Sequence, residues 1–195
     1  PVAAPMGSAC RTAGRNKASG IDKKHYHFIV EGDGAIVEGN LPPEANESTA
    51  TAYAAHTRGA NTGAIGVAFA AMHGAKERPF SAGDHPITDA QVTAMARLVS
   101  DLAARYGIPI TRRTVLTHAE VQPTLGIAQR GKWDVTWLPG MGKAGDPILV
   151  GDALRNKISA VHEPPVRPDV EPTQPAASPW GAFFGAIAAM FTRKG

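Results

Sequence analysis

Two regions in the first half of the chain have the apolar pattern of β-strands. Residues 25–37 (HYHFIVEGDGAIV) place aromatic and β-branched residues on both sides of a Gly/Asp turn at 31–34, which predicts a β-hairpin. Residues 63–71 (GAIGVAFAA) are apolar at nearly every position, as in a central strand covered on both faces. Residues 40–62 lack periodicity and are rich in Ala, Asn, Thr and Pro, so we expect a long loop there.

Two helices are predicted in the second half of the chain. Thr88 and the glutamine three residues later have the spacing of a capping box, and apolar residues then recur at helical steps up to Gly107. A second helix is predicted from Asp146, which is followed by a proline, to about Val161. The predicted strands and helices together indicate an α/β fold, with a mixed central β-sheet flanked by helices in a single domain.

The composition changes after residue 162, which divides the chain into three predicted parts. We expect a folded domain at 1–162, a proline-rich linker at 163–178 and an apolar segment at 179–195. As a helix, the apolar run 180–191 (WGAFFGAIAAMF) would be about 18 Å long, too short for a bilayer core of about 30 Å. We therefore expect this segment either to dock on the domain or to contact a membrane surface.

Charge and cysteine content narrow the choice of partner and compartment. The net charge is +3, but the basic residues are scattered without interleaved aromatics, so no nucleic-acid partner is expected. A single cysteine excludes an intramolecular disulfide. The first residues lack a basic segment followed by a continuous apolar one, so no secretory signal is predicted.

The strongest candidate for chemistry is a histidine at the end of a predicted strand. His118 directly follows an apolar strand at 114–116, and Asp134 lies 16 residues farther on. Imidazole and carboxylate are both good zinc ligands, and a catalytic zinc keeps three protein ligands and one open position. A competing pair is His25 and His27, because alternate residues of a strand share a face.

Five short motifs occur in order along residues 10–140. They are Tyr26-His27-Phe28, His56 with Asn61, Ile65-Gly66-Val67, His118-Ala119-Glu120 and Lys132-Trp133-Asp134. This series resembles the type-2 N-acetylmuramoyl-L-alanine amidases, a family that includes small phage endolysins and is similar to peptidoglycan-recognition proteins. The resemblance implies a zinc-dependent hydrolase that cleaves the amide between N-acetylmuramic acid and L-alanine of peptidoglycan, in cell-wall lysis of the endolysin kind.

The resemblance also implies a set of zinc ligands. His118 and Asp134 take the second and third ligand positions, and Cys10 stands where the family has its first histidine. A thiolate is a good zinc ligand, but residues 4–9 before it lack the branched apolar run of a buried strand. Four interpretations stay open: Cys10 is a ligand, zinc has fewer protein ligands, the chain is an inactive peptidoglycan-binding homologue, or Cys10 is a spectator.

Further roles follow from the same resemblance. Lys132 would stabilise the oxyanion of the tetrahedral intermediate, and Tyr26 would orient the water or the substrate carbonyl. Glu120 is assigned to the catalytic site as a residue that orients His118. The substrate-binding residues implied by the motifs are His56, Asn61 and His27.

The expected partner is the muropeptide stem of peptidoglycan, bound by a monomer, with a membrane contact through the C-terminal segment. We expect the protein to be made in the cytoplasm without a signal peptide and to act on the cell wall or periplasm after release. Two other function classes share the motifs. One is the binding module without hydrolysis, and the other is a cytoplasmic enzyme that recycles soluble muropeptides, for which the apolar segment has no evident purpose.

Overall fold

The computed structural model describes residues 5–6 and 16–162 of the 195 residues. The chain divides into two compact units, residues 1–164 and 165–195, and the first of these holds all the described residues. Cys10, the predicted linker and the predicted apolar segment lie outside the described residues. Among the helices that are described, none is long and apolar enough to cross a membrane.

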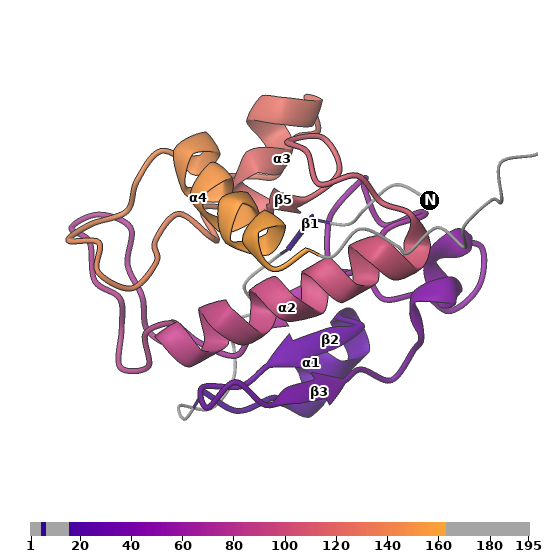
Figure 1. Ribbon diagram of the computed structural model, residues 1–195, viewed down its shortest axis with the longest axis horizontal. Coiled ribbons are helices and arrows are strands. Elements are labelled where there is room, and N and C mark those ends of the chain that lie inside the picture. Colours follow the sequence, from indigo (N-terminus) through magenta and orange to yellow (C-terminus); the bar gives the residue numbers. More distant parts are fainter. Residues whose placement is uncertain (1–4, 7–15, 163–195) are drawn as a thin grey trace, which may run out of the picture. The chain divides into compact units, whose positions relative to one another are not determined.

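A mixed sheet forms the centre of the first unit (Figure 1). Within the described residues it has five strands in the order β3-β2-β4-β1-β5. The strands are β1 (Pro5–Met6), β2 (Phe28–Val30), β3 (Ile36–Glu38), β4 (Val67–Phe69) and β5 (Leu116–Thr117). Strands β2 and β3 are antiparallel and confirm the predicted hairpin, whereas the other pairs are parallel. The predicted mixed sheet with flanking helices is therefore confirmed.

Strand β4 is buried on both faces, as its apolar sequence predicts. Val67 and Phe69 belong to the large apolar cluster that the sheet shares with the helices at Asp89–Tyr106 and Pro147–Ala160. Ala68, which points the other way, belongs to a smaller cluster that includes Tyr26. The core therefore lies on both sides of this strand.

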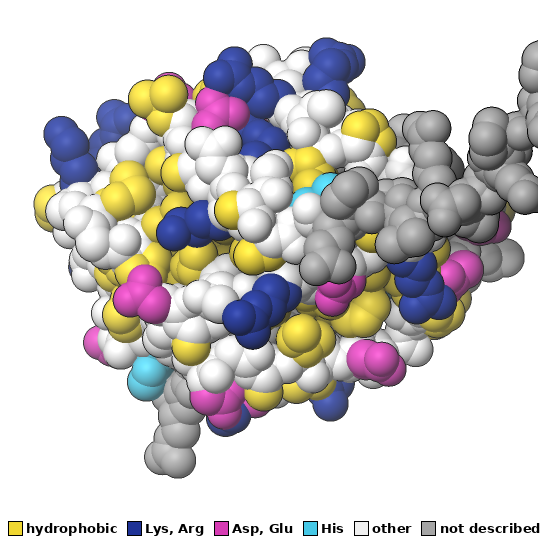
Figure 2. Space-filling model, viewed as in Figure 1, with side chains coloured by type: hydrophobic (Ala, Val, Ile, Leu, Met, Phe, Trp, Pro, Cys, Tyr) yellow, Lys and Arg dark blue, Asp and Glu magenta, His cyan; other side chains and the backbone are white. Residues whose placement is uncertain are grey.

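Four α-helices and one 3₁₀ helix surround the sheet in the described part of the chain. They are α1 (Gly20–His25), η1 (Pro43–Glu47), α2 (Asp89–Tyr106), α3 (His118–Leu125) and α4 (Pro147–Ala160). Helices α2 and α4 pack on each other and confirm the two predicted helices (Figure 1). Figure 2 shows basic and acidic side chains interspersed over the face that α2 crosses.

Helix α2 begins and ends at the predicted residues. The Thr88 hydroxyl accepts a hydrogen bond from the Gln91 N–H, and the Gln91 side chain accepts one from the Thr88 N–H. Gly107 ends the helix with a φ of +63°, in the left-handed region that favours glycine. The buried Gln91 amide also donates to the carbonyls of Val30 and Ala70, which ties the start of the helix to the sheet.

Helices α1 and α3 are not predicted by the sequence pattern. His25 ends α1, and its Nδ1 lies 3.0 Å from the carbonyl oxygen of Ala55. His27 lies outside the strand that begins at Phe28. The interpretation of His25 and His27 as a metal-binding pair on one strand face is therefore wrong.

Helix α3 places the candidate histidine at its first residue. It follows β5 directly, because Thr117 ends the strand and is also the N-cap of the helix. In the parallel pairing of β5 with β1, Met6 stands opposite Thr117. The ends of β1 and β5 consequently lie at the same edge of the sheet, next to His118.

Candidate active site

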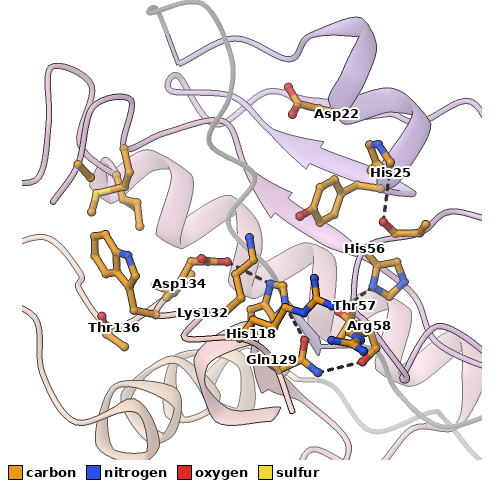
Figure 3. Close-up of a pocket in the computed structure, with 18 of the residues that line it drawn as sticks. Asp22, His25, His56, Thr57, Arg58, His118, Gln129, Lys132, Asp134 and Thr136 are labelled. Carbon is orange, nitrogen blue, oxygen red and sulfur yellow. Dashed lines mark hydrogen bonds and ion pairs between the residues drawn. The ribbon is translucent and has the colours of Figure 1, made fainter. Parts of the chain in front are cut away.

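A cleft of about 810 Å³ opens beside the end of β5. Its lining includes residues of α1, of the loop at 55–61, of the segment 72–75 and of the segment 129–137. His118 and Asp134 lie beside each other in this cleft (Figure 3). The cleft thus brings together residues from segments that lie far apart in the sequence.

The His118 ring and the Asp134 carboxylate face each other across a short gap. Nδ1 of His118 lies 3.1 Å from Oδ2 of Asp134. Both atoms are buried, and neither forms a hydrogen bond. Two buried polar atoms without hydrogen bonds are costly, so a proton or a cation between them would stabilise the pair.

Gln129 determines which nitrogen of His118 carries a proton. Nε2 of His118 lies 3.0 Å from Oε1 of Gln129. The Gln129 amide nitrogen donates to the carbonyl oxygens of Arg58 and Ile127, at 2.9 and 3.2 Å, so the amide oxygen must face the ring. Because this oxygen only accepts, Nε2 is protonated, and in the neutral ring Nδ1 presents a lone pair toward Asp134.

This arrangement fits a metal ion. A lone pair and a carboxylate oxygen repel each other at 3.1 Å unless a proton or a cation lies between them. Two ligand atoms on a tetrahedral zinc, at the usual bond lengths, lie roughly 3.4 Å apart, close to the separation seen here. Within residues 16–162, however, no three His, Cys, Asp or Glu side chains cluster, so this part of the chain brings together only two candidate ligands.

A buried polar network supports the loop that forms one side of the cleft. The Asn46 side chain, which is fully buried, accepts from the Ala54 N–H and donates to the carbonyls of Ala54 and Asn61. His27 Nδ1 accepts the Gly66 N–H at 2.8 Å, so its Nε2–H donates to Asn46. Burial lowers the pKa of His27, which keeps the ring neutral.

His27 is therefore part of this support rather than of the cleft. It is 1% exposed and does not line the cavity, which corrects its predicted role in substrate binding. His56 and Asn61 do line the cavity. The Asn61 carboxamide oxygen accepts the backbone N–H groups of His56 and Thr57, so Asn61 also holds the loop in shape.

His56 is a neutral group at the surface of the cleft. Burial is the main cause that lowers its pKa to about 3, and repulsion from the neighbouring His27 ring when both are protonated adds to it. Its ring also occupies the space beside Gly66, where any Cβ would overlap it. Tyr26 lines the cleft next to it, and the two rings stack with centroids 6.2 Å apart.

Three cationic side chains line the cleft that holds the His118–Asp134 pair. Lys132 is exposed, lines the cleft and lies beside His118 and Asp134 (Figure 3). Arg58 and Arg130 are also exposed and line the cleft. A negative charge that forms near the pair would be stabilised by Lys132, which lies beside it.

Glu120 has a different role from the one predicted. Its carboxylate is fully buried, accepts the Thr117 N–H and forms an ion pair with Arg155 at 2.7 Å. It does not line the cleft. The residue that orients the His118 ring is Gln129, which has no signal in the sequence because it lies in a loop outside every recognised motif.

Comparison with known proteins gives one family. The N-acetylmuramoyl-L-alanine amidase family matches residues 3–140, which is more than half of the chain. No curated protein matches the chain. The family match includes all three segments that supply the cleft residues His56, His118 and Asp134.

Proposed function

The chain belongs to the N-acetylmuramoyl-L-alanine amidase family, and from this we propose that it hydrolyses peptidoglycan with the help of zinc. The bond cleaved would be the amide between the lactyl carbonyl of N-acetylmuramic acid and the nitrogen of L-alanine. The observation that carries the zinc proposal is the buried pair of His118 Nδ1 and Asp134 Oδ2, which are 3.1 Å apart and have no hydrogen bonds.

His118 and Asp134 are two of the proposed zinc ligands, and Cys10 is the third. Zinc bound there would supply Lewis-acid chemistry that polarises the amide carbonyl and activates water. Cys10 follows Met6 by four residues, and Met6 pairs with Thr117, which precedes His118.

The other cleft residues would bind and orient the substrate. The Lys132 ammonium would stabilise negative charge on the carbonyl oxygen as the tetrahedral intermediate forms. The Tyr26 side chain, which packs on His56, would orient the water or that carbonyl. His56 is neutral at pH 7, so it would serve as a hydrogen-bonding or packing surface and not as a charged group.

A second candidate function is peptidoglycan binding without hydrolysis. It is favoured by the presence of only two clustered ligand side chains in the part of the chain that the structure describes. Both candidates use the same cleft and the same partner. They differ in whether Cys10 completes the zinc site.

Alkylation of Cys10 separates the two candidates. In the zinc amidase the Cys10 thiolate is bound to metal, so iodoacetamide should modify it only after a chelator is added. Purified sacculi treated with the protein should then release stem peptides with a free L-alanine amino terminus. Rapid alkylation in the presence of zinc, with hydrolysis seen only after Cys10→His, would support the binding protein.

We also propose an endolysin-like context, with a monomer that acts on the cell wall after release from the cytoplasm. The proposal is supported by the family and by the sequence of 179–195, where an apolar run is followed by basic residues. That segment is proposed to contact a membrane surface. Sedimentation with lipid vesicles is the test of this contact.

A further inference from the structure

The side chain of Gln129 joins a proposed zinc ligand to the loop at the edge of the cleft. Gln129 is 5% exposed, although it lies in a segment whose neighbours are partly or fully exposed. Its amide oxygen lies 3.0 Å from His118 Nε2, and its amide nitrogen donates to the carbonyls of Arg58 and Ile127. Its backbone N–H donates to the side chain of Gln122 at 3.0 Å.

The two halves of this amide do different things. The nitrogen half binds backbone carbonyls and so holds the loop that carries Arg58 against the loop that carries Ile127. The oxygen half is the acceptor for the proton on His118 Nε2 and leaves Nδ1 free to face Asp134. No other hydrogen-bond partner of the His118 ring occurs among the described residues.

We propose that Gln129 is a positioning residue for the metal site, which holds His118 in the tautomer and orientation that bind zinc through Nδ1. The inference rests on the proposed zinc-dependent function. A histidine that binds metal through Nδ1 must keep its proton on Nε2, and a buried N–H without an acceptor is costly. Partners of this kind orient the ring and make the ligand more basic, and their loss usually weakens metal binding about 10- to 100-fold.

A purely structural role for Gln129 makes a different prediction, and two substitutions separate the roles. Gln129→Glu keeps an acceptor for the His118 proton but loses the two N–H bonds to the carbonyls of Arg58 and Ile127. Gln129→Met has a similar length and loses both the acceptor and the donors. If Gln129 only holds the loops, the two variants should behave alike.

The experiment measures the zinc dissociation constant of the full-length chain by competition with a chromophoric chelator. We expect Gln129→Met to bind zinc about 10- to 100-fold more weakly than wild type, and Gln129→Glu to stay within about threefold of wild type or to bind more tightly. Urea unfolding of the zinc-free variants should show a loss of stability in both. Gln122→Met is the matched control, because Gln122 contacts the backbone of Gln129 and not His118, and its zinc affinity should not change.

The inference would be overturned if zinc binding were weakened equally in Gln129→Glu and Gln129→Met, or not weakened at all in Gln129→Met. Either result would leave the proposed zinc amidase function unaffected. A wild-type chain that binds no zinc would overturn both the inference and the proposed function.

A measurement on the wild type covers the case in which Gln129→Met does not fold. In nitrogen-15 spectra of the zinc-loaded protein, His118 should show a slowly exchanging proton on Nε2. A proton that exchanges freely with water would overturn the inference.

Discussion

At the residue scale, the site depends on which atoms are charged and which are neutral. His56 and His27 are kept neutral by burial, whereas Lys132 and Arg130 are exposed cations at the cleft.

The motif residues Tyr26, His56, His118 and Asp134 could all be placed near the site from the sequence, because each lies in a short motif and the motifs follow the order found in the family. Gln129 could not, because its amide is oriented toward His118 by a contact across 71 residues to Arg58, which no local pattern reveals.

Lys132 is expected to act on the transition state and not on zinc binding. Lys132→Ala should lower kcat by roughly 10²- to 10³-fold, the usual effect of removing one group that stabilises an oxyanion. Zinc content should stay unchanged, as measured by atomic emission on the dialysed variant. Arg130→Ala is the matched control, because it removes another exposed cation of the same cleft. An increase in KM alone would show instead that Lys132 only binds substrate.

The low pKa of His56 predicts a stability that depends on pH. The folded-state pKa is about 3, below the ordinary value of 6.5, so the unfolded chain binds a proton in this interval and the folded protein does not. The free energy of unfolding should therefore be constant above pH 6.5 and fall toward pH 3, with a slope of up to about 1.4 kcal/mol per pH unit. The lowered pKa of His27 acts in the same direction.

Urea unfolding of the zinc-free protein between pH 7 and pH 4 measures this slope. His56→Gln removes the titrating group, so its slope should be smaller than that of the wild type. An unchanged slope in this variant would show that other groups account for the acid sensitivity.

At the element scale, helix α3 holds His118 through a buried ion pair that the sequence does not reveal. Glu120 in α3 and Arg155 in α4 are both buried, and Arg155 also donates to the carbonyl of Val115 at 2.8 Å. A side chain at Gly151 would overlap the Glu120 carboxylate, so this glycine allows the close approach of the two helices. The ion pair therefore fixes the start of α3, where His118 lies.

Removal of Arg155 should destabilise the fold strongly. Arg155→Met leaves the Glu120 carboxylate buried without its partner, and the free energy of unfolding should fall by roughly 3–5 kcal/mol. Arg112→Met is the control, because Arg112 forms an exposed ion pair with Asp152, and its effect should be far smaller. Urea unfolding of both variants gives the comparison. A similar small loss for both would show that α3 is held mainly by apolar packing.

The periodic and capped elements were predictable, and the short ones were not. Helix α2 has 18 residues and clear caps, so both its ends could be placed from the sequence. Helix α3 has eight residues and contains Pro123, which gives too little periodicity for a prediction. Helix α1 has six residues, and its aromatic neighbours suggested a strand instead.

At the scale of the whole molecule, the folded unit is longer than the family match. The match ends at residue 140, but α4 at Pro147–Ala160 packs on α2 and supplies the partner of Glu120. The first compact unit, which contains α4, ends at residue 164. The chain should therefore need residues up to about 160 in order to fold.

Two truncations test this division of the chain. A chain ending at residue 140 should lose its cooperative thermal unfolding transition, because α4 and the partner of Glu120 are missing. A chain ending at residue 178 should keep the transition and the hydrolysis of soluble muropeptides but sediment less with anionic lipid vesicles. Loss of the transition in the longer chain would show instead that 179–195 docks on the domain.

The central claim is that the His118–Asp134 pair binds zinc, and the most direct test is the zinc content of the purified protein. The wild-type chain, loaded and then dialysed, should hold about one zinc per molecule, as expected for a mononuclear catalytic site. His118→Ala should hold almost none while it still unfolds cooperatively. A full equivalent of zinc in His118→Ala, or none in the wild type, would contradict the account.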